Sequence, residues 1–452
     1  MSKARMVLCV ASLVAAGAGC SDFLSGVAGD PNNPAAATRD QLFIAAQAGQ
    51  FGQQEAAVAQ VVCMWTQQCA GIGGRFVDQR GRYNFTPVDF SFDFTSVYIG
   101  GGLVDLRQIQ ASADADGDEV YGAIARVWEA LVIGTAADVW GDTPYREAAG
   151  SQAHPVLDPQ LQIYGDLQAL LDRAIADLGG SGAGPGAHDL VYGGDAAAWT
   201  AAANTLKARY HLHTVEVLGD PAYDAAIAAA TNGIASAAGD WQAFHTDATQ
   251  EANLWYQFST TSFGQDIVAG KALADLMLAR NDPRLPEYFG RNALGGYGGE
   301  DINAPVPANQ VSPLSGSRNA PDFRQPLVTW AENQLILAEA KFVRQGAAAA
   351  QPHLDAVRTS LGLASVPATL QAIMEEKYVA LFQNIEAWSD YRRTCIPALA
   401  PFATTLYQNK IPGRLYYGSS EQNANPNVPG ETDQLVTGGV GFRNAADQAP
   451  CP

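Results

Sequence analysis

The chain has 452 residues, of which 47% are hydrophobic and 16% are charged, so a folded globular body is expected and global disorder is excluded. The formal net charge of −19 disfavours nucleic acids and anionic membrane surfaces as partners. No internal run approaches the roughly 20 continuous apolar residues that a membrane span requires.

The N-terminus is typical of an exported bacterial lipoprotein. Lys3 and Arg5 precede an apolar run over residues 6–16, and small residues then lead to Cys20. This layout predicts a signal peptide that is removed and a lipidated cysteine, although Gly17 stands where such signals usually carry an aliphatic residue. Plain secretion without a lipid is the alternative.

The sequence therefore divides into three predicted segments. Residues 1–19 form the lipoprotein signal peptide, and residues 20–38, which are small and polar, form a lipid-anchored tether. Residues 39–452 form one α-helical domain. This length exceeds that of a usual single hydrophobic core, but a helical array can reach it.

Four cysteines remain once the signal peptide and Cys20 are set aside: Cys63, Cys69, Cys395 and Cys451. An even number in an exported protein indicates disulfides, and four thiols allow three pairings. Cys63 and Cys69 cannot pair if one helix holds both, because six helical residues rise about 9 Å and a disulfide needs Cα atoms within about 7 Å. If the helix ends between them, they can pair, and Cys451 would then join the tail to Cys395.

Hydrophobic periodicity predicts helices along most of the remaining chain. The expected ranges are 40–65, 103–113, 123–140, 164–178, 196–217, 221–237, 268–279, 327–344, 351–361 and 370–391. Two stretches, 196–237 and 327–361, have the layout of a helix, a short turn and an Ala-rich helix, which is typical of tetratricopeptide-like pairs. A mainly α fold follows.

The predicted amphipathic helix at 123–140 ends abruptly. The sequence from Trp140 through Gly141, Asp142 and Pro144 to Tyr145 combines a helix-ending glycine, a turn-favouring aspartate and a proline that keeps its predecessor out of the helical region. Aromatic side chains on both sides of such a turn usually pack. We therefore interpret these five residues as a structural motif.

The sequence gives no indication of a catalytic site. It contains no G-x-S-x-G, H-E-x-x-H or Walker motif. His211 and His213 lie about 200° apart on a helix and cannot share a metal ion. Glu375 and Glu376 are expected on a solvated helix face. We therefore expect no enzymatic activity, no cofactor and no metal.

Aromatic side chains on or beside loops are the better functional candidates, because sugar rings stack on aromatic faces while neighbouring polar groups bind the hydroxyls. The segment 290–326 is rich in Gly, Pro and Asn and has no periodicity, so it is expected to be functional or disordered. The candidate ligand contacts are Trp65, Arg75, Tyr83, Phe85, Trp255 and Tyr256.

Several short segments, taken in order, resemble the SusD/RagB-like family of outer-membrane nutrient-binding lipoproteins, in its second SusD-like branch. They are Asp30-Pro31-Asn32, the turn at 140–145, NTLKARY at 204–210, NDPRL at 281–285, the helix at 331–340, EAWSDYRR at 386–393 and IPGRLYY at 411–417. Each segment alone is weak, but their shared order is a strong signal.

The resemblance implies tetratricopeptide-like helix pairs forming a right-handed helical scaffold, with long irregular loop insertions and little β structure. It implies a lipid-anchored protein on the outer face of the outer membrane. Such a protein binds an oligosaccharide or peptide and delivers it to a SusC-like TonB-dependent transporter. The residues alone leave two alternatives open: a helical-repeat scaffold lipoprotein without a small ligand and, less favoured, a secreted hydrolase.

Overall fold

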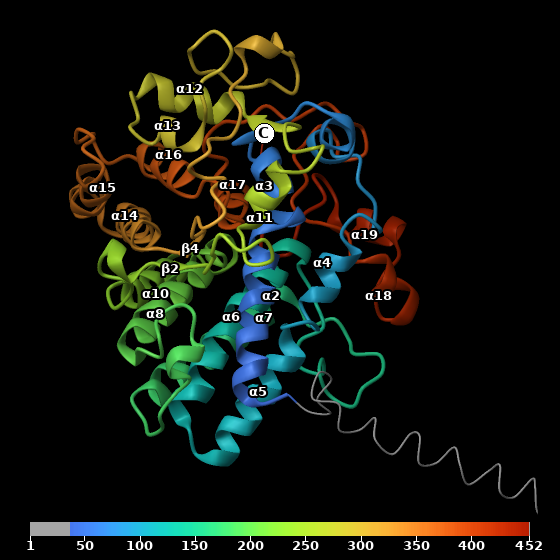
Figure 1. Cartoon of the computed structure of the whole chain (residues 1–452), viewed down its shortest axis with the longest axis vertical. Coiled ribbons are helices and arrows are strands. Elements are labelled where there is room, and N and C mark those ends of the chain that lie inside the picture. The colour runs from blue at the N-terminus through green and yellow to red at the C-terminus, as the bar shows by residue number, and fades with distance from the viewer. Residues whose placement is uncertain (1–36, 452) are drawn as a thin grey trace, which may run out of the picture.

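The computed structural model describes residues 37–451, which form mainly α-helices with two short antiparallel strand pairs, β1–β3 and β2–β4 (Figure 1). The mainly α fold with little β structure is confirmed. The elements are α2 (Arg39–Glu55), α3 (Ala57–Trp65), β1 (Cys69–Gly71), η2 (Phe76–Gly81), α4 (Ser91–Ser96), α5 (Leu103–Asp116), α6 (Glu119–Trp140), α7 (Gln160–Leu178), α8 (Ala196–Leu212), α9 (Val215–Leu218), α10 (Asp220–Ala230), β2 (Trp241–Gln242), α11 (Leu254–Ser259), β3 (Ile267–Ala269), α12 (Lys271–Ala279), α13 (Leu285–Tyr288), β4 (Pro326–Val328), α14 (Trp330–Gln345), α15 (Ala347–Ser360), α16 (Leu370–Ala380), α17 (Glu386–Thr394), α18 (Ser419–Ala424) and α19 (Glu431–Gly438).

Helix α6 is buried on all sides, so the expectation of an amphipathic helix is wrong. Its polar residues Arg126 and Glu129 are only 1% and 2% exposed. Arg126 donates to Asp114 of α5 at 2.5 Å and to Asp177 of α7 at 3.1 Å, and two side chains of α5 donate to Glu129. The sequence of α6 alone could not reveal these partners. The helix is long and apolar enough to cross a membrane, but here it is the core helix.

The predicted helix pairs correspond to α8 with α10 and α14 with α15. Helix α10 packs against both α8 and α14, which links the two pairs. Small buried side chains, including Ala208, Ala226 and Ala340, lie in this contact and let the helices approach closely. A separate buried cluster with Leu335 and Leu354 joins α14 to α15.

The predicted helix over 40–65 is divided into α2 and α3. The break comes directly after Glu55, whose buried carboxylate faces a neighbouring segment. Its oxygens lie 2.6 Å from Nε2 of His245 and accept a hydrogen bond from the backbone N–H of Leu254 at 3.0 Å. These long-range contacts stabilise a local irregularity that hydrophobic periodicity does not reveal.

Other predicted helices also differ from the structure, and two of them show why. The range 370–391 is divided between α16 and α17 by a turn in which Gln383 has a φ of 62°. The start of the range 268–279 is strand β3, because Val268 pairs with Ala70 of β1. Strand pairing between segments this distant in sequence overrides the local helical pattern.

The turn after α6 ends the helix as predicted. Gly141 has a φ of 79°, and a Cβ at this position would lie 2.5 Å from Oδ1 of Asn444. The buried Trp140 donates its indole N–H to a backbone carbonyl of the C-terminal segment at 3.0 Å. Asp142 accepts from the backbone N–H of Gln160 at the start of α7. The turn thus connects α6 with α7 and with the C-terminal segment.

Replacing Gly141 by alanine should lower the free energy of unfolding by about 1–3 kcal/mol, because the backbone conformation disfavours a side chain and Asn444 occupies the space. Urea unfolding followed by tryptophan fluorescence measures the loss. Gly165→Ala is the matched control, because a Cβ there meets nothing within 4 Å. Equal stability of the two variants would contradict the prediction. Pro144 and Tyr145, which follow in the same turn, are also buried.

Two disulfides are present, and they have the local pairing. Helix α3 ends at Trp65 and β1 begins at Cys69, so Cys63 and Cys69 lie on different elements with Cα atoms 5.0 Å apart. Cys395 directly follows α17 and pairs with Cys451, with Cα atoms 5.2 Å apart. The second bond attaches the C-terminal segment to the helical body.

Replacing both Cys395 and Cys451 by alanine should lower the free energy of unfolding by about 2–4 kcal/mol. The crosslink joins residues separated by 56 positions and so restricts the unfolded chain strongly. Urea unfolding of the oxidised proteins measures the difference. Because Cys63 and Cys69 are only 6 positions apart, their double alanine variant should lose less. An unchanged midpoint for the Cys395/Cys451 variant would refute the expectation.

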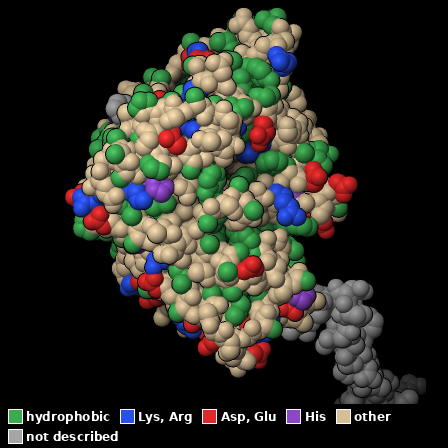
Figure 2. Space-filling model, turned by 90° about the vertical axis from the view of Figure 1, so that its left-hand side faces the viewer, with side chains coloured by type: hydrophobic (Ala, Val, Ile, Leu, Met, Phe, Trp, Pro, Cys, Tyr) green, Lys and Arg blue, Asp and Glu red, His purple; other side chains and the backbone are tan. Residues whose placement is uncertain are grey.

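Residues 1–36 lie outside the described range. The predicted signal peptide over 1–19, the lipid anchor at Cys20 and most of the tether over 20–38 therefore stay predictions, as does the assignment of 39–452 to one domain. Figure 2 shows one face of the molecule, on which acidic and basic side chains are scattered among uncharged surface. On that face the net negative charge is not gathered into one patch.

Candidate functional site

A cavity of about 300 Å³ lies between two segments that are far apart in the sequence. The first runs from the end of β1 through η2, and the second belongs to the long loop over 290–326. This loop lies with α12 and α13 at the upper end of Figure 1, whereas α2 begins at the lower end. The lining residues are Gly71, Ile72, Val77, Gly81, Arg82, Glu300, Asp301, Ile302, Pro305, Val306, Ala308 and Val311.

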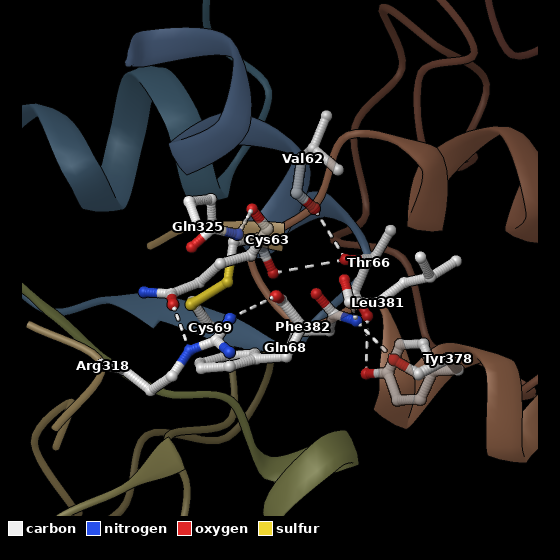
Figure 3. The surroundings of a disulfide bond; sticks show 11 residues. Val62, Cys63, Thr66, Gln68, Cys69, Arg318, Gln325, Tyr378, Leu381 and Phe382 are labelled. Atoms are coloured by element: carbon white, nitrogen blue, oxygen red, sulfur yellow. Dashed lines mark hydrogen bonds between the residues drawn. A yellow bond between two sulfur atoms is a disulfide. The ribbon is translucent and has the colours of Figure 1, made fainter. Parts of the chain in front are cut away.

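The first wall is fixed where it leaves α3 (Figure 3). The Cys63–Cys69 disulfide joins the end of α3 to the start of β1. Between them, the Gln68 side-chain amide donates to the backbone carbonyl of Tyr378 at 2.7 Å, and the Tyr378 hydroxyl donates to the carbonyl of Thr66 at 2.8 Å. Helix α16 thereby holds the short connection, and the wall that follows begins from a fixed point.

The second wall is attached to the same strand pair. Strand β3 pairs with β1, and the backbone N–H of Ala269 in β3 also donates to the carbonyl of Ser312 at 2.9 Å. The N–H of Glu300 donates to the carbonyl of Ala269, and the N–H of Lys271 donates to the carbonyl of Glu300. Both walls therefore depend on one small hydrogen-bonded unit, and the loop over 290–326 is held against it.

The cavity has mainly aliphatic walls. Ile302 and Val306 pack with Val311, Val268 and Ala70 in a small separate hydrophobic cluster. None of the lining side chains in the described part of the chain is an aromatic ring. The surface resembles the mostly apolar small-molecule sites of proteins, in which a few polar groups set the orientation of the ligand.

Three charged residues line the cavity. Glu300 is 8% exposed, and burial raises the pKa of its carboxyl, while the nearby Val306 backbone N–H opposes that rise. Asp301 accepts hydrogen bonds from two backbone N–H groups that follow it in the loop. Arg82 forms an exposed ion pair with Asp78 at 3.2 Å. The cavity thus presents an acidic side and one arginine.

Four of the predicted ligand contacts are in fact core residues. Trp65, Tyr83, Phe85 and Trp255 are each at most 2% exposed. The Trp65 ring lies 5.7 Å from that of Tyr83 and 5.0 Å from that of Phe85, and it also packs on Trp388. These four buried side chains are not available to a ligand in this structure. The prediction fails because the rings that could stack on a sugar are equally suited to fill a core.

The other two predicted contacts lie nearer the surface. Arg75 is exposed, with its guanidinium carbon 5.6 Å from the ring centroid of Phe263. Tyr256 is half-buried on α11. Neither residue lines the cavity, so the structure does not bring them together with its polar groups, and their contact with a ligand stays a prediction.

Sequence reasoning missed the aliphatic residues and Glu300. Isolated Ile and Val residues in a loop carry no distinctive pattern, and an acidic residue in a loop is usually solvated. The only available signal was the length and irregularity of the segment 290–326, which marked it as functional or disordered. That signal indicated the segment but not its residues.

A second group of titratable residues is buried beside α6. The Nδ1 atom of His213 lies 2.7 Å from Asp138, and its Nε2 atom lies 2.8 Å from Glu386. Burial alone would lower the pKa of His213, but the two carboxylates raise it to about 10. With a carboxylate at each ring nitrogen, the imidazole is held as a cation. This arrangement favours an ion-pair network over a metal site, because neither nitrogen has a free lone pair.

Comparison with known proteins agrees with this fold. The SusD-like_2 family model, described as "Starch-binding associating with outer membrane", matches residues 31–418. A SusD/RagB family protein from Bacteroides thetaiotaomicron has a TM-score of 0.73 at 20% identity, covering 92% of this chain and 98% of that chain. No curated protein sequence matches the chain.

Two further solved structures are similar. A chitin-binding SusD homologue from Flavobacterium johnsoniae has a TM-score of 0.74 at 19% identity, covering 91% of this chain and 100% of that chain. A Bacteroides vulgatus outer-membrane protein, described as probably involved in nutrient binding, has a TM-score of 0.73 at 17% identity, with 91% and 100% covered. The family consists of outer-membrane-associated nutrient-binding proteins. With the family model matching most of its length, the chain belongs to the SusD-like family.

Proposed function

We propose that this protein is a cell-surface lipoprotein that binds a nutrient, an oligosaccharide or a peptide, and delivers it to a SusC-like TonB-dependent transporter. The observation that carries the proposal is the cavity between β1–η2 and the loop over 290–326. The loop over 290–326, which forms one of its walls, lies with α12 and α13 at the end of the molecule opposite the start of α2 (Figure 1). A tether preceding α2 would therefore attach to the end of the molecule away from this loop.

The remaining parts of the proposal agree with the sequence and the family. A lipid on Cys20 would hold the protein on the outer face of the outer membrane, and no second membrane element is needed. Binding without turnover is expected, because the cavity lining within residues 37–451 contains no nucleophile with an adjacent base. The ligand would therefore be released unchanged into the transporter.

Affinity purification from detergent-solubilised outer membranes tests the delivery role. A tagged protein should recover a TonB-dependent barrel at near-equal abundance, identified by mass spectrometry. The Cys20→Ser variant is the matched control, because it removes the lipid and should lower membrane retention and barrel recovery together. Recovery of the lipidated protein alone from an intact membrane fraction would contradict the proposal.

A further inference from the structure

The walls of the cavity are poorly suited to stacking a sugar ring. Stacking uses the flat faces of Trp, Tyr or Phe. The cavity instead offers the branched side chains of Ile72, Val77, Ile302, Val306 and Val311, and none of the lining residues between 37 and 451 is aromatic. A branched aliphatic surface of this kind fits an aliphatic group of similar size.

Glu300 adds a charge to this apolar surface. Its backbone is fixed between Ala269 and Lys271, so the residue cannot move away from the cavity without breaking two hydrogen bonds. The residue is only 8% exposed, Asp301 adds to the rise in the pKa of its carboxyl, and no ion pair joins that carboxyl to a cation within residues 37–451. A buried carboxylate without a cationic partner is costly, and a ligand cation would offset that cost.

Arg82 supplies the opposite charge on the wall of η2. Its guanidinium lies 5.0 Å from the ring centroid of Phe402 and 3.2 Å from the exposed Asp78. An exposed pair of this kind contributes little energy and is readily exchanged. Arg82 can therefore turn to a carbonyl or carboxylate group of a ligand that occupies the cavity.

We propose that the cavity selects the amino-terminal end of a short peptide, with the ammonium group bound by Glu300 and an aliphatic first side chain held between Ile302, Val306 and Val77. Arg82 binds the carbonyl or carboxylate end of the same ligand. This assignment of the ligand class rests on the proposed nutrient-binding function. It excludes a neutral oligosaccharide as the preferred ligand, because such a ligand carries no cation for Glu300.

Calorimetric titration of the whole chain, purified from membranes in detergent, tests the assignment. The probes are the tripeptide Leu-Gly-Gly, its N-acetylated form and chitotriose. Leu-Gly-Gly should bind, and acetylation should weaken binding at least about 10-fold, because a charged hydrogen bond is lost. Glu300→Gln should weaken binding of Leu-Gly-Gly by a similar factor. Glu287→Gln, an exposed acid on α13, is the matched control and should have no effect.

Several outcomes would overturn the assignment. Equal binding of the free and acetylated peptides would do so. The absence of peptide binding by the natural protein, shown to be folded by its thermal unfolding transition, would do so as well. If chitotriose binds and Val306→Trp abolishes this binding, the assignment of a peptide ligand is also rejected. The proposed nutrient-binding function would not be contradicted by that result. Failure of the proposed function would instead be seen in the affinity purification, as recovery of the protein from membranes without a barrel.

Discussion

Replacing His213 by leucine should lower the free energy of unfolding by about 3–5 kcal/mol, because it leaves two buried carboxylates without their shared cation. Asp138 and Glu386 lie on either side of the ring at 2.7 Å and 2.8 Å. Some compensation remains, since Asp138 accepts from the Tyr164 hydroxyl at 2.6 Å and Glu386 lies 3.7 Å from Arg209. Urea unfolding measures the loss.

His211 provides the matched control for this substitution. It is half-buried, lies two residues earlier, and its side chain forms no hydrogen bond or ion pair with any residue from 37 to 451. His211→Leu should therefore change stability by no more than about 0.5 kcal/mol. Equal losses from the two variants would show that the carboxylate contacts of His213 contribute nothing.

The same contacts predict a pH dependence. The pKa of His213 is about 10 in the folded protein and about 6.5 in an unfolded chain. A folded-state pKa that is raised contributes stability that is complete below about pH 6.5 and is lost as the pH rises to about 10. The free energy of unfolding of the natural protein should fall over this interval more steeply than that of His213→Leu. Parallel pH profiles would contradict the prediction.

Replacing Glu376 by glutamine should have an effect of similar size, about 3–5 kcal/mol. Its carboxylate is fully buried and forms ion pairs with Arg280, with Arg284 at 2.6 Å and with Arg358 at 2.7 Å. Asp282 also binds Arg284 at 2.7 Å and lies 3.8 Å from Arg280, so two of the three cations keep a partner. Arg358 would lose the one carboxylate with which it forms an ion pair among residues 37–451. The substitution would therefore weaken the packing of α15, α16 and the segment around α13 against one another.

Glu375→Gln, at the preceding position of α16, is the control. Glu375 is half-buried, and the only interaction of its side chain among the described residues is with Gln371 of the same helix. Glu375→Gln should therefore lower the free energy of unfolding by no more than about 0.5 kcal/mol. Thermal unfolding monitored by circular dichroism compares the two variants. A Glu376→Gln protein as stable as Glu375→Gln would show that the three arginines do not depend on the buried carboxylate.

Local signals in the sequence were sufficient for several features of the fold. Gly141 and Pro144 marked the end of α6, and the spacing of Cys63 and Cys69 showed that they could pair only if the helix ended between them. Each of these features depends on residues close together in the chain. Backbone conformation and turn chemistry are set at that range, so a single sequence carries the information.

Features set by distant contacts were not predictable in this way. Glu376 was expected on a solvated face together with Glu375, but it binds three arginines from two other segments, the connection between α12 and α13 and helix α15. Trp65 was expected to contact a ligand, yet it lies within an aromatic core cluster. The cavity was missed for the same reason, since Val77 and Val306 lie far apart in the sequence and come together through tertiary contacts such as the β1–β3 pair. Tertiary contacts decide which of two equally suitable environments a side chain enters.

The attachment of both cavity walls to one strand pair has a consequence for how fast and how tightly a ligand associates. A loop that orders itself only on binding loses conformational entropy at that moment, and affinity falls accordingly. Here the hydrogen bonds of Ala269 with Glu300 and Ser312 hold the loop before any ligand arrives. The entropy is lost during folding instead, so the site is pre-organised. Its affinity should then reflect direct contacts with the ligand, and release of the ligand should require only that these contacts break.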